Sequence, residues 1–265
     1  MAAPTRFYLS GTAAAFNVGG SVNAAGVNSA WEGKISLANT TNKLTLTADS
    51  TLSIVSNASV IGSGTNPNDW WYYSGMSDVL PNGKLLNGNF QGVCCCRESA
   101  TNTNAFTQCA VYVVDSGGSL LATLVAPQTS GSGTEYNNPS ANTRMFPRTY
   151  TTGSGPAISS YTTVNATSRI VIEVGTRIET TRTADTVYMY LGNSGGSDLP
   201  GGGDGVSNNL TINPWFEFSI DVFAAPAGGG AKSIAAVAMG YWDRHEDGLF
   251  LPADYRPGRR IYAFG

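Results

Sequence analysis

Charged residues are scarce in this sequence. Lys, Arg, Asp and Glu make up 12% of the 265 residues, about half the share of an ordinary soluble protein. Long amphipathic helices are therefore not expected, and Thr, Ser and Asn must supply the polar surface, as they do on strands and turns. The net charge of −3 and the isoelectric point of about 5.1 provide no basic field for DNA or RNA. Nucleic-acid binding is not expected.

Long apolar runs and signal sequences are also missing. No stretch approaches the roughly 18 consecutive apolar residues of a membrane span. The start, MAAPTR, has no basic region followed by an apolar one. The sequence therefore predicts a soluble protein without membrane contact or a visible export signal.

Cysteine and histidine are too rare for a disulfide scaffold or a Cys/His metal site. Four cysteines occur in the chain, and the run CCC at residues 94–96 lacks the CxxC spacing of metal sites. The one histidine, His245, lies near Asp243 and Glu246 without a partnered nucleophile, so we interpret it as part of a solvated turn. No metal, cofactor or catalytic residue is predicted.

The acidic residues do not form an obvious acid–base pair. A glycoside hydrolase needs two facing carboxylates, and the candidates are Glu173, Glu179, Asp185 and Glu217. Glu173 and Glu217 alternate with apolar residues, which predicts that they face outward from strands. The two acidic residues in the Gly-rich stretch 192–209 are too few for a Ca²⁺ site. We therefore predict that the protein is not an enzyme.

The sequence does contain a repeated alternation of apolar and polar residues, which is the period of a β-strand. Ile170 and Ile172 share one side of the stretch 169–178. Glu173 and Arg177 share the other side, which predicts a half-buried strand. About a dozen strands are expected, over residues 6–9, 34–37, 43–47, 51–55, 70–73, 84–96, 106–114, 119–125, 158–164, 169–178, 187–191 and 216–222.

Turn residues separate these strands and predict how they pair. Asn82-Gly83 and the DSGG stretch at 115–118 suit tight turns between antiparallel neighbours. Two stretches rich in Gly, Ser and Asn, 128–136 and 192–209, are expected to be exposed loops at one end of a sandwich. The predicted fold is all-β, an antiparallel β-sandwich with jelly-roll topology.

A change in composition predicts a boundary near the C-terminus. The stretch AAPAGGG at 224–230 has linker composition, so we expect a sandwich domain over 1–224 and a linker with an extension over 225–265. The extension is too poor in apolar residues for a core of its own, but it contains residue types common at interface anchors. We predict an arm that contacts other subunits through Tyr241, Trp242, Phe250, Tyr255, Arg256, Arg259 and Arg260.

Several motifs together resemble a known group of proteins. They are TRFYL at 5–9, RIVIEVG at 169–175, YLGN at 190–193, SDLP at 197–200 and NPWFEFS at 213–219. In this order and spacing they are similar to the motifs of structural proteins from tailed bacteriophages and prophages. The resemblance covers residues 5 to about 220. Ser10 replaces the usual Pro, the cysteines at 94–96 replace small polar residues, and the tail after Pro226 has no counterpart.

The resemblance implies a virion component with a jelly-roll or related fold, made in the cytoplasm of the bacterial host and assembled with other virion proteins. It brings no catalytic residues with it. A capsid decoration or head-fibre subunit and a minor tail protein are both compatible with it. The absence of long repeats and coiled-coil heptads favours the capsid exterior over a distal fibre.

An aromatic run, Trp70-Trp71-Tyr72-Tyr73, has two interpretations. Alternate residues of a strand face opposite ways, so two of the four side chains should enter the core and two should point outward. The outward pair is expected either at a subunit contact or, in the alternative function, on a host-glycan-binding surface. Low charge, outward aromatics and uncovered sheet edges also predict a homo-oligomer, with a trimer favoured.

The cysteines allow a specific pairing hypothesis. If residues 101–104 form a four-residue turn, 84–100 and 105–114 form a hairpin in which Cys96 lies opposite Cys109, close enough for a disulfide. Cys94 would share the face of Cys96, and Cys95 would point the other way. The alternative is that all four cysteines are small buried thiols.

Overall fold

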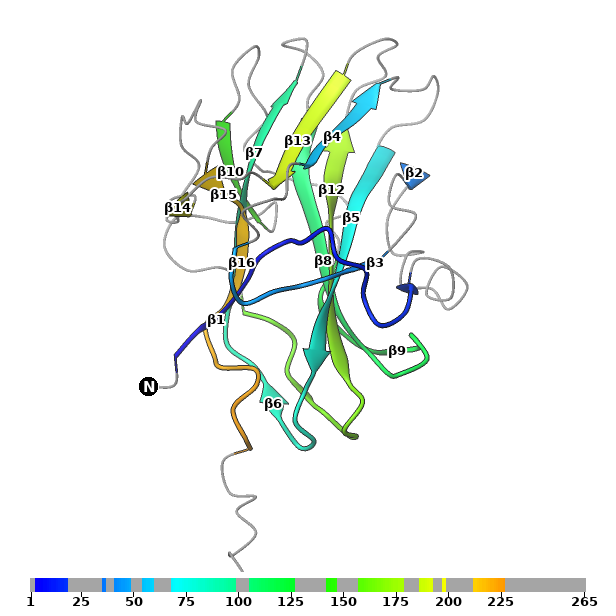
Figure 1. The fold of residues 1–265 in the computed structure, drawn as a ribbon, viewed down its shortest axis with the longest axis vertical. Helices are drawn as coiled ribbons and strands as arrows, with labels where there is room; N and C mark the ends of the chain where they lie inside the picture. The colour runs from blue at the N-terminus through cyan, green and yellow to red at the C-terminus, as the bar shows by residue number, and fades with distance from the viewer. Residues whose placement is uncertain are drawn as a thin grey trace, which may run out of the picture. The chain divides into compact units, whose positions relative to one another are not determined.

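The computed structural model describes residues 3–18, 35–36, 41–48, 54–59, 68–98, 105–126, 142–146, 157–178, 186–192, 197–198 and 212–226. These ranges contain strands β1 to β16, which gather mainly into two larger sheets (Figure 1). The all-β prediction is therefore confirmed.

Eight strands form the frame of the sandwich, four in each large sheet. In spatial order the first sheet has β4 (Ile54–Ser59), β13 (Thr186–Gly192), β7 (Phe90–Glu98) and β10 (Asn142–Phe146). The second sheet has β5 (Asn68–Val79), β12 (Arg169–Ile178), β8 (Ala105–Val114) and β9 (Leu120–Val125).

The pairing of these eight strands is nested. In chain order, the first strand pairs with the last (β4 with β13), the second with the seventh (β5 with β12), the third with the sixth (β7 with β10) and the fourth with the fifth (β8 with β9), all antiparallel. One long antiparallel ribbon that is rolled into two facing sheets gives this order, which defines a jelly roll.

The remaining strands extend this frame. β1 (Thr5–Phe7) and β16 (Trp215–Phe218) join the first sheet, β2 (Ile35–Ser36) and β3 (Thr41–Lys43) pair in parallel with β5, β6 (Leu85–Leu86) pairs with β11 (Tyr161–Thr162), and β14 (Ser197–Asp198) pairs in parallel with β15 (Ile212–Asn213).

Two strands of the first sheet are interrupted at the same level. Along one edge of β7, β13 pairs with residues 95–98 and β16 continues the line by pairing with residues 90–93. β1 pairs with β16 in the same antiparallel way as β4 pairs with β13. β1 and β4 are therefore also collinear, with a gap between them. The chain therefore leaves this sheet after Phe7 and after Gly192, and it returns at Ile54 and at Trp215.

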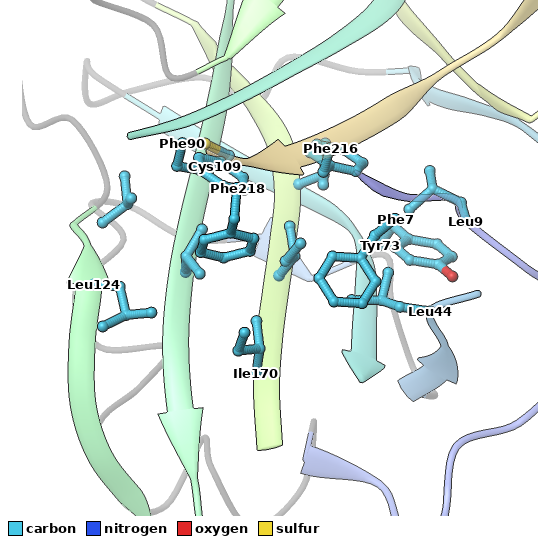
Figure 2. Close-up of a cluster of buried hydrophobic side chains, with 14 of the residues drawn as sticks. Phe7, Leu9, Leu44, Tyr73, Phe90, Cys109, Leu124, Ile170, Phe216 and Phe218 are labelled. Carbon is cyan, nitrogen blue, oxygen red and sulfur yellow. The ribbon is translucent and has the colours of Figure 1, made fainter. Parts of the chain in front are cut away.

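The main core lies between the two sheets (Figure 2). The second sheet contributes Ile170, Ile172 and Val174 of β12, as their alternation predicted, and each is 0% exposed. The first sheet contributes aromatic rings: Phe7 packs edge to face with Phe218 at a centroid distance of 6.1 Å, and Phe90 packs against Phe218 in a tilted arrangement at 5.0 Å. Burial of these side chains is the main force that holds the sheets together.

The polar side of β12 is buried, and the prediction of a half-buried strand is wrong. Glu173 and Arg177 are both 0% exposed. β12 lies between β5 and β8, and an apolar cluster covers part of the other face of this sheet. In that cluster, Val171 packs with Val18, while Ala14 and Phe16 pack against it, so the N-terminal segment supplies cover that a strand pattern does not show.

Strand boundaries also differ from those predicted. The expected strand 84–96 is broken into β6 and β7 by a bend at Gly88, whose φ of 89° is in the left-handed region. β10 was not predicted, and β14 lies inside the expected loop 192–209. The turn after β8 is confirmed, because the Asp115 carboxylate accepts hydrogen bonds from the N–H groups of Gly117 and Ser119.

The hairpin that would have joined Cys96 to Cys109 does not form. β7 and β8 belong to different sheets, where Cys96 pairs with Asn142 and Met189 while Cys109 pairs with Val174. All four cysteines are free and buried. The predicted register is wrong because a jelly roll carries the chain across to the facing sheet after β7, whatever the local turn chemistry.

The chain divides into two units, Met1–Ala225 and Pro226–Gly265. The second unit lies outside the described residues after Pro226, so the extension over 225–265 stays a prediction. Within the described ranges, no helix has the length and apolar character needed to cross a membrane.

A buried tyrosine connects the N-terminal segment to the core. The Tyr73 hydroxyl accepts a hydrogen bond from the Ser10 N–H (3.1 Å) and donates one to the Ser10 carbonyl (3.0 Å). Tyr73→Phe should lower the free energy of unfolding by about 1–3 kcal/mol, because both buried backbone groups lose their partner. Urea unfolding of this variant and of Tyr161→Phe, at a half-buried ring on the edge of the core, measures the effect. Equal losses would contradict the prediction.

Candidate functional site

Three of the five motifs that carry the resemblance meet on the outer face of the first sheet. TRFYL supplies Arg6 and Tyr8, SDLP supplies Asp198, and NPWFEFS supplies Trp215 and Glu217. We call these five residues the Arg6 cluster. Register brings two of them together, because Arg6 lies directly opposite Glu217 in the pairing of β1 with β16. Asp198 comes from β14, in the stretch of chain that interrupts β13 and β16.

Arg6 is the centre of the cluster. Its Nη1 lies 2.7 Å from Asp198 Oδ2, and its Nε and Nη2 lie 2.9 and 2.8 Å from Glu217 Oε2. The guanidinium carbon is 4.0 Å from the centroid of the Trp215 ring. The Tyr8 hydroxyl donates to Asp198 Oδ2 (2.8 Å), and the side-chain amide of Gln91 donates to Glu217 Oε1 (3.2 Å). One cation therefore joins two carboxylates and an aromatic ring.

Partial burial strengthens these interactions. The side chains of Arg6 and Asp198 are 34% and 32% exposed, and that of Glu217 is 16% exposed. Burial alone lowers the pKa of Arg6, but the hydrogen bonds to Asp198 and Glu217 raise it, and the net direction is upward. The guanidinium remains charged.

The arrangement joins separate strands. Both carboxylates bind the same cation, which connects β1 to β14 and to β16. Two of the candidate acid–base residues, Glu173 and Glu217, lie on different sheets and do not face each other as an acid–base pair. The other two, Glu179 and Asp185, lie outside the described residues. Glu217 does point away from the core, as predicted, but it is bound to Arg6.

Further aromatic rings lie beside the Arg6 cluster on this outer face. Val93, Cys95 and Trp215 are buried beneath the partly buried rings of Tyr8 and Tyr190. Beside them, the guanidinium carbon of Arg97 lies 4.2 Å from the centroid of the Tyr188 ring. The described residues contain no group of three or more His, Cys, Asp or Glu that could hold a metal ion.

The aromatic run in β5 is only partly described. Tyr73 is 2% exposed and belongs to the core, as two of the four aromatic residues were expected to do. The side chains of Trp70, Trp71 and Tyr72 lie outside the described part of the chain, as do the residues of the predicted arm. A glycan-binding surface on this run and the arm contacts therefore stay predictions.

Sequence reasoning from strand patterns missed the ion pair between Arg6 and Asp198. The two residues are 192 positions apart, and Asp198 lies in a stretch predicted to be a loop. The one signal was the resemblance, which singled out TRFYL and SDLP together without giving a physical reason.

Alkaline pH should weaken the cluster through Tyr8. Burial, the hydrogen bond to Asp198 and the negative charge of Asp198 all raise the pKa of Tyr8. The unfolded chain, with a tyrosine pKa of about 10, releases this proton first, so the contribution of Tyr8 to stability is full below about pH 10 and is lost as pH rises through the folded-state pKa. Tyr8→Phe should therefore lose stability less steeply than the wild type in urea unfolding between about pH 8 and pH 11. Equal slopes would show that Tyr8 is not coupled to folding.

The strand order and the Arg6 cluster define the class: an antiparallel jelly-roll sandwich with a structural ion-pair cluster on its first sheet. No protein-family model and no curated protein matches the chain.

Among similar solved structures are chains of infectious bursal disease virus. The Gx strain chain has 11% identity and a TM-score of 0.27 over 77% of this chain and 52% of the viral chain. The Gt strain chain has 8% identity and a TM-score of 0.26 over 77% and 53%. The protein thus spans about half the length of these viral chains. At such TM-scores the likeness carries no argument about function.

Proposed function

We propose that this protein is a structural subunit of a tailed-bacteriophage virion and that it has no catalytic activity. The supporting observation is the Arg6 cluster. Three motifs that resemble those of phage structural proteins, far apart in the sequence, supply side chains that contact one another. The motifs thus act as one unit that holds β1, β14 and β16 together. Jelly rolls also occur in viral capsids, which is an argument from fold alone.

Within a virion, the capsid exterior is the placement we favour. The described domain is a jelly roll without long repeats, and it suits docking on a lattice better than building a distal fibre. The protein would be made in the host cytoplasm and would bind other virion proteins there.

Counting the copies of this chain per particle tests the proposal. Particles purified from the phage or lysogen that encodes the chain are digested, and isotope-labelled peptides of the chain quantify it against the major capsid protein. On the order of hundreds of copies are expected for a capsid lattice, and about three to twelve would move the protein to the tail. Absence from purified particles would overturn the virion role. A low copy number, together with binding of host polysaccharide by the particle-bound chain through the outward residues of the run 70–73, would support the alternative of a host-glycan-binding module of a phage tail or fibre.

We also propose that the C-terminal extension joins subunits into a homo-oligomer, with a trimer favoured. Tyr241, Trp242 and Tyr255 are the aromatic anchors of this extension. Trp242→Ala combined with Tyr255→Ala should shift the mass in light scattering toward one chain of 27.7 kDa while the unfolding transition of the sandwich stays in place. Val164→Ala, at a side chain that is 68% exposed in the sandwich, is the matched control. A wild-type protein that is monomeric both in solution and on particles would contradict the proposal.

A further inference from the structure

Two of the three consecutive cysteines form a close pair inside the sandwich. The Sγ atoms of Cys94 and Cys96 are 3.1 Å apart. Both side chains are 0% exposed and belong to the core between the sheets. Cys95 points the opposite way, into the cluster with Val93 and Trp215. The predicted facing of these three residues is therefore confirmed, although the predicted partner of Cys96 was wrong.

The fold holds the two thiols together. Residues two apart on a strand share a face, and β7 is fixed along both edges, by β10 at residues 92–96 and by β13 at residues 95–98. Cys109 also faces this core, but from β8 of the other sheet. Cys94, Cys96 and Cys109 are all 0% exposed, so what distinguishes the first two is the 3.1 Å between their Sγ atoms.

We propose that Cys94 and Cys96 are a reversible oxidation site, at which a small peroxide converts the two thiols into an intrastrand disulfide. One sulfur takes an oxygen atom from the peroxide and becomes a sulfenic acid, and the peroxide leaves as water or an alcohol. The second sulfur then attacks the first, the S–O bond breaks, and the oxygen leaves as water with the two remaining protons. Two thiols are oxidised by two electrons, and the peroxide O–O bond is reduced.

The geometry explains why oxidation should stop at the disulfide and why the disulfide should be easy to reduce. The second sulfur already lies beside the first, so disulfide formation should be faster than further oxidation of the sulfenic acid to sulfinic acid. Two residues apart on a strand, Cα atoms are separated by about 6.4–6.8 Å, near the upper limit of about 6.8 Å for disulfides. The bond therefore draws β7 together and carries strain, and strained disulfides are readily reduced. This chemistry is independent of the proposed virion role.

Peptide mapping tests the inference on the full-length protein. Trypsin cleavage after Lys84, Arg97 and Arg144 places Cys94, Cys95 and Cys96 in one peptide and Cys109 in another. The folded protein is treated with hydrogen peroxide, unfolded in acid, alkylated and digested. The peptide 85–97 should be lighter by two hydrogen atoms than its reduced form and should carry one alkyl group, on Cys95. Dithiothreitol, added before alkylation, should restore three alkylated cysteines.

Other results would overturn the inference. Three alkylated cysteines after peroxide, a bond that includes Cys95, or a link between the two peptides would each exclude a Cys94–Cys96 site. Cys95→Ser should keep the bond and Cys96→Ser should abolish it. Peroxide treatment in urea should give mixed pairings, and the same single bond in urea would show that the fold does not select it. The wild-type map decides the question even where a variant does not fold.

Discussion

Arg6→Met is expected to lower the free energy of unfolding by about 1–2 kcal/mol. The substitution keeps an apolar stem over Trp215 but removes the cation that Asp198 and Glu217 share, which leaves two carboxylates near each other without their partner. The estimate is below that for a buried pair because about a third of the Arg6 side chain is exposed. Urea unfolding at neutral pH and low salt measures the loss, and high salt should reduce the difference between the two proteins.

A second ion pair supplies the control for this experiment. Lys43 Nζ and Asp78 Oδ1 are 3.1 Å apart, but their side chains are 43% and 67% exposed. Lys43→Met should therefore change stability by less than about 0.5 kcal/mol. A double-mutant cycle of Arg6→Met with Glu217→Gln should show that the two effects are not additive. Additive effects, or equal losses at Arg6 and Lys43, would mean that the cluster is not an energetic unit.

Gly92→Ala is expected to lower stability by about 1–3 kcal/mol, the range of overpacked cores. Gly92 lies opposite Phe216 in the pairing of β7 with β16. A Cβ atom at this position would clash with Cδ1 of the Phe216 ring, and it would lie 2.8 Å from Cε1 of that ring and 3.3 Å from the carbonyl oxygen of Trp215. The ring cannot swing away freely, because it is 0% exposed and its centroid lies 6.3 Å from that of Phe90, with the rings nearly parallel.

Gly117→Ala is the matched control for Gly92→Ala. Its added Cβ would contact only Asp115 Oδ1 at 3.4 Å, in the exposed turn after β8. Thermal unfolding should place the Gly117 variant close to the wild type and the Gly92 variant several degrees lower. A Gly92 variant as stable as the control would show that Phe216 has room to move.

The alternation of apolar and polar residues predicted most of the eight strands that form the sandwich. It did not predict which faces of those strands are buried by other segments of the chain. The spacing of Ile170, Ile172 and Val174 was enough to place β12 and its core face, because alternation is a local property of strands. The burial of Glu173 was not predictable in this way, since it depends on cover from distant segments. β10, with the sequence NTRMF, has too weak an alternation to be recognised.

Pairing partners were harder to predict than strands. A favourable local turn suggested that β7 and β8 form a hairpin, but the rolled ribbon gives β7 the partners β10, β13 and β16. The Arg6 cluster depends on pairing across nearly the whole chain, with Arg6 and Glu217 separated by 211 positions. Neither strand periodicity nor turn chemistry carries information over that distance.

The first sheet has two breaks at the same level, one between β1 and β4 and one between β13 and β16. The segments that bridge these breaks have more freedom to change length than the paired strands do. Because the segments after Phe7 and after Gly192 leave the sheet and the strands resume in line, added residues there need not shift the register of any paired strand. Longer loops cost little extra closure entropy. In the second segment, added residues are compatible with the Arg6 cluster only where they keep Asp198 within reach of Arg6.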